Sequence, residues 1–246
     1  TGSGLTSFTI PDSVTSIEYF AFYNCSGLTS ISIPDSVNSI GNNAFKSCSS
    51  LAIITIGNSV TSIGEGAFWN CTNLTSLSLP DSLISIGKVA FYGTGLSFQE
   101  DTNSIKYLIS ASGNTAYLID GSSSTGSVVL PNTLYGASVA IIRDGAFNHS
   151  GLTSITIGDG VTSLGIDAFQ YCSNLHSVIF EGDAPTFGTN AFGENNSEVF
   201  RVYYDSSKSG WSGTAAGKPT VTTNILTLTL NLSLIHISEP TRRYSI

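Results

Sequence analysis

The sequence has few charged residues and no methionine. Asp, Glu, Lys and Arg make up 11% of the 246 residues, and Lys and Arg together number only nine. These nine are scattered among 17 acidic residues, so the formal net charge is −8. Such a chain offers no basic patch to neutralise phosphates, and we expect neither nucleic acid nor an anionic membrane surface as a partner.

Long hydrophobic runs are also missing. No stretch approaches the roughly 20 residues that a membrane-spanning helix needs, so we expect no membrane insertion of this chain. The chain begins at Thr1 rather than at Met and shows no signal peptide, and we expect the natural N-terminus to lie upstream. Apolar residues nevertheless make up 41% of the sequence, which predicts a packed core rather than disorder.

Residues that usually carry chemistry are scarce. Of the three histidines, only His149 and His176 lie outside the C-terminal residues 232–246, and both fall at the boundary between two similar segments. A catalytic histidine needs a nucleophile or a carboxylate within hydrogen-bond reach, and no motif supplies one. We therefore expect no catalytic residues and predict that the protein is not an enzyme.

A repeat of 23 residues dominates the sequence. Its units start at Leu5, Leu28, Leu51, Leu74, Leu152 and Leu175. Apolar residues recur in phase, and one position carries phenylalanine in six units: Phe22, Phe45, Phe68, Phe91, Phe147 and Phe169. A fixed period with fixed apolar positions is typical of stacked units, each of which buries its side chains against its neighbours.

The second unit shows the structure that we expect for each repeat. Thr29–Ile33 alternates polar and apolar residues, which predicts a half-buried strand. Pro34 and Asp35 predict a turn, and Val37–Ile40 a second short strand. Asn43–Cys48 places its apolar residues on one face, which predicts a single helical turn. The predicted fold is an α/β repeat solenoid with strand–turn–strand–short helix units.

Two parts of the chain depart from this period. Residues 96–151 contain two strand-like runs, Ile105–Ile109 and Ala116–Ile119, which predict a β-hairpin inside an irregular unit. Towards the C-terminus the repeat decays, and a terminal unit must be covered by a cap. We divide the chain into a solenoid at 1–192, a cap at 193–221 and a tail at 222–231.

The last residues have an unusual origin in our interpretation. Residues 232–242 agree at all eleven positions with the conceptual translation of a transposase-type sequencing adapter. The alternative is a natural amphipathic strand. We interpret 232–246 as derived from the adapter and exclude it from functional reasoning, as is usual for sequence that does not belong to the protein.

The repeat resembles a known family. Leu28-Thr-Ser-Ile-Ser-Ile-Pro-Asp-Ser-Val-Asn-Ser-Ile-Gly-Asn-Asn-Ala-Phe-Lys-Ser-Cys48 is similar to the BspA-type leucine-rich repeat, and Gly210-Trp211 resembles the closing piece of such arrays. The resemblance covers about residues 5–221. It implies a solenoid of the leucine-rich-repeat type and an extracellular or cell-surface protein of bacteria or protists, often an adhesin. A structural spacer that projects another domain is the alternative function, and an enzyme of unknown class is a remote one.

Two sets of equivalent surface positions are candidate binding sites for an extracellular protein or a glycan. Outward-facing strand positions form a hydroxyl face with almost no charge, at Ser30, Ser32, Thr55, Ser76 and Ser78. The position after each phenylalanine carries an aromatic residue in three of the first four units, at Tyr23, Trp69 and Tyr92. Aromatic residues often anchor interfaces. Equally, Ser and Thr are ordinary on exposed strands, and the aromatic rings could lie over neighbouring units.

Two further repeated positions have structural explanations. The cysteines Cys25, Cys48, Cys71 and Cys172 are equivalent, so their side chains point the same way, which favours buried free thiols over disulfides or zinc ligands. An acidic residue recurs after the first strand, at Asp12, Asp35, Asp81 and Asp159. These acidic residues suit turns better than calcium ligation. We expect neither a metal site nor a cofactor.

Overall fold

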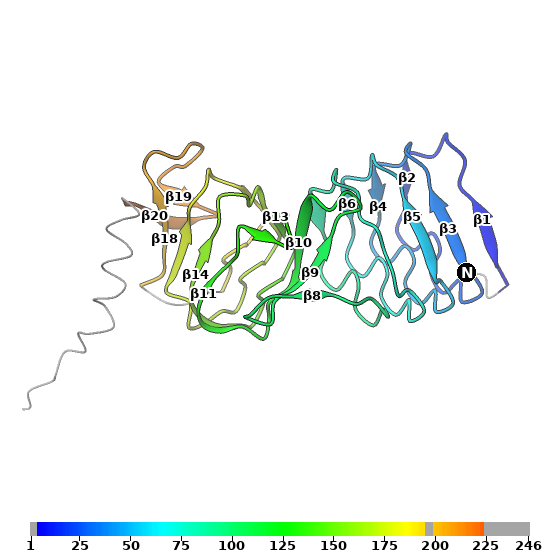
Figure 1. Cartoon of the computed structure of the whole chain (residues 1–246), viewed down its shortest axis with the longest axis horizontal. Coiled ribbons are helices and arrows are strands. Elements are labelled where there is room, and N and C mark those ends of the chain that lie inside the picture. The colour runs from blue at the N-terminus through cyan, green and yellow to red at the C-terminus, as the bar shows by residue number, and fades with distance from the viewer. Residues whose placement is uncertain (1–3, 195–198, 224–246) are drawn as a thin grey trace, which may run out of the picture.

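The computed structural model describes residues 4–194 and 199–223. Successive coils stack side by side along the long axis of an elongated solenoid, from the first coils at one end to the last strands at the other (Figure 1). The proposed tail, beyond its first two residues, and the proposed adapter-derived segment at 232–246 lie outside the described residues. The division into solenoid, cap and tail stays a prediction.

Each of the first three coils contributes one strand to each of two parallel sheets, and the fourth coil contributes a strand to the second sheet alone. The first sheet has the order β1 (Ser7–Thr9), β3 (Ser30–Ile33) and β5 (Ile53–Ile56). The second has the order β2 (Ser16–Ile17), β4 (Ser39–Ile40), β6 (Ser62–Ile63) and β7 (Ser85–Ile86). Ile31 pairs with Ile54, which lies 23 positions later, so the sequence period sets the register between coils.

The predicted short helix is wrong, because the described residues contain no helix. The segment 41–48 instead forms consecutive turns in which alternate N–H groups have different acceptors. The N–H of Lys46 donates to the carbonyl of Asn43 (3.1 Å), whereas the N–H of Phe45 donates to the carbonyl of Ala67 in the next coil (2.8 Å). An α-helix would bond every N–H to the carbonyl four residues earlier. Hydrogen bonding between coils therefore replaces the helix.

We call residues 41–48 and their equivalents the turn segment of each coil. Each segment has two residues with positive φ, four positions apart, such as Asn43 (55°) and Ser47 (63°). Asparagine, serine and glycine fill most of these positions in the first coils, and asparagine and glycine adopt this conformation with little steric cost. The chain can thus reverse direction within a few residues, and the apolar residues between the two positions still point inward.

The phenylalanines form a stacked ladder in the N-terminal part of the core. Neighbouring rings of Phe22, Phe45, Phe68 and Phe91 have centroids 5.0, 5.4 and 5.8 Å apart and lie within 5° of parallel. The cysteine column runs beside them, and the Cys48 thiol donates to the carbonyl of Phe22 (3.0 Å). Cys25, Cys48 and Cys71 are free and buried, which confirms the prediction for these three thiols, and Cys172 is buried as well.

A second, separate ladder forms the C-terminal core. Phe147, Phe169 and Phe192 stack with centroids 4.8 and 5.6 Å apart. Between the two ladders lies a coil in which Gly121 occupies the phenylalanine position. Its N–H donates to the carbonyl of Ala146 (2.7 Å), as phenylalanine N–H groups in other coils do. The absence of a ring at Gly121 ends the first ladder at Phe91.

A β-hairpin separates the two cores. Strands β9 (Lys106–Ile109) and β10 (Thr115–Asp120) pair antiparallel, and β8 (Gln99–Glu100) pairs with the outer side of β9. The side chains of Tyr117 and Ile119 pack into the N-terminal core, and those of Ala116 and Leu118 pack into the C-terminal core. Both faces of β10 are therefore buried, each in a different core, and the hairpin divides the solenoid. We call residues 5–95 the N-terminal block, 96–124 the partition unit and 125–221 the C-terminal block.

The C-terminal block continues the two-sheet arrangement. One sheet has the order β11 (Thr125–Val129), β14 (Gly151–Ile157), β16 (Ser177–Phe180), β18 (Arg201–Asp205), β20 (Lys218–Thr223) and β19 (Thr214–Ala215). The other joins β17 (Thr186–Phe187), β15 (Ser163–Leu164) and β13 (Ala137–Ile142) to the hairpin, and β12 (Thr133–Leu134) pairs with β13. At its end the ring of Trp211 stacks on Tyr204 (4.7 Å).

Candidate binding site

Only part of the predicted hydroxyl face lies on a β-sheet. Ser30 and Ser32 in β3 and Thr55 in β5 are exposed, and the hydroxyl of Thr55 donates to that of Ser32 (2.9 Å). Ser76 and Ser78 are exposed too, but their segment belongs to no named strand and the sheet ends at β5. The row of hydroxyl groups is therefore interrupted before the fourth unit.

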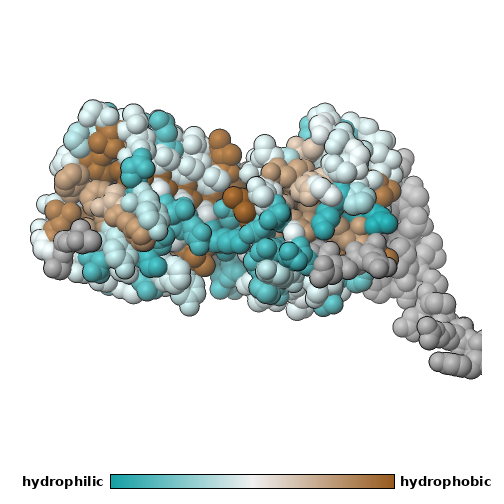
Figure 2. Space-filling view, turned by 180° about the vertical axis from the view of Figure 1, so that it is seen from behind, coloured by the Kyte–Doolittle hydropathy of each residue, from teal (hydrophilic) through white to brown (hydrophobic). Residues whose placement is uncertain are grey.

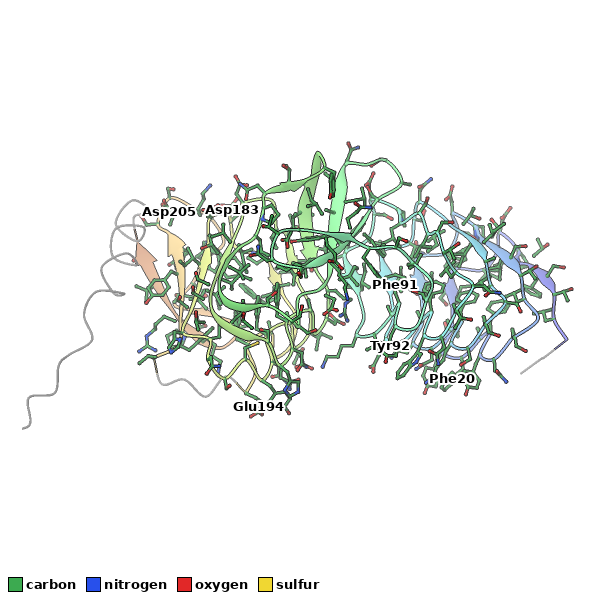
Figure 3. All side chains as sticks on the ribbon, turned by 60° about the horizontal axis from the view of Figure 1, so that its bottom comes forward. Phe20, Phe91, Tyr92, Asp183, Glu194 and Asp205 are labelled. Atoms are coloured by element: carbon green, nitrogen blue, oxygen red, sulfur yellow. The ribbon has the colours of Figure 1, made fainter. Side chains whose placement is uncertain are left out.

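The predicted aromatic positions lie on the edge formed by the turn segments. The rings of Trp69 and Tyr92 meet edge to face with centroids 5.6 Å apart, and the ammonium of Lys46 lies 4.3 Å from the centroid of Trp69. Tyr23 instead contacts Phe20, with centroids 4.8 Å apart. Tyr23 and Trp69 are half-buried, whereas Tyr92 is 63% exposed. Figure 3 shows Phe20 and Tyr92 along one edge of the molecule.

A cleft of about 540 Å³, which our sequence reasoning missed, opens where the first ladder ends. One wall is the turn segment at 88–94, and the opposite wall includes Gly145, Asn148 and His149. Ile119 and Ser122 of the partition unit lie between them. Seen from behind, hydrophilic residues gather around the middle of the molecule, where the two blocks meet (Figure 2).

The cleft exists because the turn of the partition unit is short. In a regular coil four residues separate Ile40 from Phe45, whereas two separate Leu118 from Gly121, which occupy the equivalent positions. The following coil reaches past the shortened turn, and the N–H of Asp144 donates to the carbonyl of Ile86 in the N-terminal block (3.0 Å). The two blocks thus touch at this point and diverge beyond it.

One wall of the cleft carries backbone N–H groups that have lost their usual acceptors. In regular coils three N–H groups of each turn segment donate to the next coil, for example Phe68 to the carbonyl of Ala90 (2.8 Å). The equivalent N–H groups of Val89, Phe91 and Gly93 have no acceptor among the described residues. Unpaired backbone donors are uncommon in folded proteins unless water or a ligand reaches them.

The end of the second ladder provides a comparison. The equivalent N–H groups of the last such turn segment, those of Asn190, Phe192 and Glu194, also have no acceptor in the part of the chain that the structure describes. That row lies at the end of the stack, where no further turn segment follows within residues 4–194. The row at 89–93 differs because a second wall stands opposite it.

Val89 adds backbone strain to the same wall. Its φ is 49°, in the left-handed region, where the equivalent residues in neighbouring coils are Gly66 (59°) and Gly145 (63°). A β-branched residue adopts this conformation only at a cost of about 1–3 kcal/mol, and such strain is often found at functional sites. The strained backbone of Val89 is therefore a second feature of this wall that is typical of a functional site.

Charges around the cleft are largely paired within the protein. Lys88 forms an ion pair with Asp167 (2.5 Å), and Lys106 lies 3.6 Å from Asp120. Burial lowers the pKa of Arg143 to about 10, so its guanidinium stays charged at neutral pH, and it donates to the carbonyls of Ile119 and Asp144. The cations at the cleft are therefore bonded within the protein, the two lysines to carboxylates and Arg143 to carbonyls.

Other kinds of site find little support in the described residues. Residues 4–194 and 199–223 contain no group of three or more His, Cys, Asp or Glu that could hold a metal ion. Burial raises the pKa of Cys172, which keeps this thiol protonated and unreactive. Among the repeated acidic residues, Asp35 accepts a hydrogen bond from the N–H of Asn58 in the next coil (2.6 Å). Nor does this part of the chain contain a helix that could cross a bilayer.

The stacked coils, the register fixed by the 23-residue period and the phenylalanine ladders define a solenoid of leucine-rich repeats. A model of the BspA type leucine-rich repeat region matches residues 1–117 and 114–209, with six copies. The chain therefore belongs to the BspA-type leucine-rich repeat family, and the resemblance noted for its second unit is confirmed. No curated protein shows significant similarity to the chain.

Several solved structures are similar to the chain. A leucine-rich repeat protein of T. pallidum is 28% identical, covers 81% of this chain and 81% of its own length, and has a TM-score of 0.40. One from Bacteroides capillosus is 31% identical over 38% of this chain and 75% of its own, with a TM-score of 0.35. One from Bacteroides ovatus is 26% identical over 85% of this chain and 64% of its own, with a TM-score of 0.36.

Proposed function

We propose that the chain is an extracellular or cell-surface recognition module that binds a protein or a glycan through its repeat surface. The observation that carries the proposal is a pair of aromatic groups on the two sides of the cleft. Trp69 and Tyr92 lie on one side, and His149 stacks on Tyr171 on the other, with centroids 4.7 Å apart. Exposed aromatic side chains provide large contact areas at little entropic cost and often anchor interfaces.

The hydroxyl face is the second surface available for recognition. Ser30, Ser32 and Thr55 offer exposed donors and acceptors on a rigid sheet, with Ser76 and Ser78 beside it. These groups are small and uncharged, so they would contribute adaptable hydrogen bonds rather than anchors. We call Trp69 and Tyr92 the aromatic edge, and we propose that it makes the main contact and the hydroxyl face the lesser one.

Binding assays with matched variants test this proposal. The full chain would be assayed against extracellular matrix proteins and a glycan array, beside a Trp69→Ala/Tyr92→Ala variant and a Ser30→Ala/Ser32→Ala variant. For any partner bound, we expect the aromatic variant to lose at least about tenfold in affinity, which is about 1.4 kcal/mol, and the hydroxyl variant to lose less. Uniformly negative assays with the folded chain would overturn the proposal.

A structural spacer is the second candidate, and one observation favours it. The stacked coils make an elongated body in which neighbouring coils are joined by parallel pairing and by the ladders (Figure 1). Such a body could project another domain without binding anything itself. Binding that survives in this chain alone would argue against a pure spacer. We expect no enzymatic activity, since neither His149 nor His176 hydrogen-bonds to a carboxylate among the described residues.

A further inference from the structure

We infer that the cleft between the blocks binds a peptide segment of a partner protein, which takes the place of the turn that the partition unit lacks. This inference rests on the proposed recognition function and names its site and ligand class. The cleft lies where a regular coil would have placed two more residues of turn.

The unpaired donors have the spacing of a peptide backbone. Within the repeats, the N–H groups two residues apart in one turn segment bond to carbonyls two residues apart in the next, at 2.7–3.3 Å. The row at Val89, Phe91 and Gly93 keeps this spacing and lacks the carbonyls. A polypeptide backbone supplies carbonyls at a regular two-residue interval, so main-chain hydrogen bonds give affinity in the way that added strands do.

The opposite wall of the cleft offers an unpaired acceptor. In the regular coils the N–H of Asn70 donates to the carbonyl of Tyr92. The equivalent pair across the cleft would be Gly93 and Asn148, but the carbonyl of Asn148 has no donor among the described residues. The side-chain oxygen of Asn148 is also buried without a partner. A ligand that both donates and accepts in alternation satisfies both walls, which is a property of peptide backbone.

The residues that line the cleft favour particular side chains on the ligand. Phe98 and Ile119 give the cleft an apolar part. The two lysines at the cleft are paired with Asp120 and Asp167, and the guanidinium of Arg143 donates to two backbone carbonyls. Unpaired charge on the ligand would therefore find little compensation. The volume of about 540 Å³ is in the range of ordinary ligand sites, which run from about 300 to 1,000 Å³. These features select a short uncharged segment with an apolar side chain.

The inference is tested with a displayed library of random peptides as long as the turn segment (residues 41–48), selected on the full chain. Ser122 lies in the cleft and is exposed, and its neighbour Ser123 is exposed outside it. Ser122→Trp therefore obstructs the cleft, and Ser123→Trp is the matched control. Circular dichroism checks that both variants fold, and Ser122→Arg replaces the first variant if it does not.

Selected peptides are expected to bind the wild-type chain and Ser123→Trp equally and Ser122→Trp at least tenfold more weakly. Binding should also slow amide exchange at Val89, Phe91 and Gly93 by at least tenfold. Equal binding to both variants, or unchanged exchange at these amides, would overturn the inference. The inference would also be overturned if Ser122→Trp abolished the binding of a glycan and left the binding of the selected peptides unchanged. Failure to select any peptide while the aromatic edge binds a partner overturns the inference and leaves the proposed function standing.

Discussion

The regular coils of the N-terminal block and the partition unit differ by two residues in one turn, and that difference has large consequences. In the regular coils each turn segment satisfies the backbone of its neighbour, and the phenylalanines stack without interruption. In the partition unit the turn is too short to reach the equivalent row, and Gly121 replaces the ring. The result is two cores, one row of unpaired N–H groups and a cleft.

The comparison shows how a repeat protein can gain a distinct site. Repetition by itself gives a uniform surface, because equivalent residues lie in equivalent surroundings. A local departure leaves the adjoining coils intact, since each coil contacts mainly its neighbours. The hairpin makes the departure tolerable by burying Tyr117 in one core and Leu118 in the other.

The largest expected effect comes from removing a ring in the middle of either ladder. Phe68→Ala and Phe169→Ala each delete a fully buried ring that stacks on both sides, at a cost of about 3–5 kcal/mol. If the hairpin separates the cores, Phe68→Ala lowers the urea midpoint reported by amides of the N-terminal block more than that of the C-terminal block. Phe169→Ala should do the reverse. Equal loss in both blocks for both variants would mean one cooperative core.

A smaller effect is expected at the position that interrupts the ladder. A Cβ built on Gly121 would lie 2.2 Å from a ring carbon of Phe147. Gly121→Ala should therefore cost about 1–3 kcal/mol through overpacking, as measured by thermal unfolding. Gly213→Ala is the matched control, because a Cβ there has no atom within 4 Å. A stable Gly121→Ala variant would show that the ring of Phe147 can move and that the gap between ladders is not fixed.

A smaller loss of stability is expected when the contact between the hairpin and the N-terminal block is weakened. The hydroxyl of Tyr117 donates to the carbonyl of Pro80 (2.6 Å) at a buried site. Tyr117→Phe removes this bond and leaves a carbonyl without its donor, so we expect a loss of about 1–2 kcal/mol in chemical denaturation. Tyr107→Phe, which removes a bond to the carboxylate of Asp101 within the partition unit, is the comparison. Only Tyr117→Phe should loosen the N-terminal block from the hairpin.

A still smaller loss of stability is expected when the ion pair that bridges the blocks is broken. Lys88 and Asp167 have side chains that are 31% and 15% exposed, and one carboxylate oxygen of Asp167 is buried without a partner. Lys88→Met leaves that carboxylate without its cation, at an expected cost of about 1 kcal/mol after allowance for solvent. A double-mutant cycle with Asp167→Asn measures the coupling. A coupling energy indistinguishable from zero would show that this ion pair does not help to join the blocks.

The smallest effect concerns acid. The neighbouring hydroxyl groups of Ser110, Ser112 and Thr115 in the hairpin lower the pKa of Asp81 in the N-terminal block. A carboxyl group with a lowered folded pKa stabilises the fold above its ordinary pKa, and this contribution is lost as the pH falls through the lowered value. The melting temperature of the wild-type chain should therefore fall slightly more between pH 5 and 3 than that of Asp81→Asn. Parallel curves would contradict this role.

Periodicity in the sequence predicted the stack, its register and the inward phenylalanines, because these depend on residue type at fixed spacing. It could not distinguish a helical turn at Asn43–Cys48 from consecutive turns, since both place Ala44 and Phe45 on one side. The difference lies in bonds to the next coil, which a single unit does not reveal. The repeat spacing also identified Trp69 and Tyr92 as equivalent positions, and whether they bind a partner stays a proposal.

The cleft was beyond reach of the same reasoning for a physical reason. It depends on an absence, the two residues missing before Gly121, and on how the next coil reaches across to Ile86. Aligning the partition unit on the second-strand position of Leu118, rather than on the leucine that starts each unit, would have exposed the deletion. The unpaired row at Val89 follows only once the neighbouring coil is placed.

Amide hydrogen exchange by NMR tests whether the hydrogen bonding between coils is interrupted at the partition unit. The account predicts fast exchange at Val89, Phe91 and Gly93, whose N–H groups lack acceptors in the described chain, and slow exchange at Gly66, Phe68 and Asn70, which bond to the next coil at 2.8–3.0 Å. The two rows occupy the same positions in adjacent coils, so each is the control for the other. Equally slow exchange in both rows would contradict the interruption of the solenoid and the cleft that follows from it.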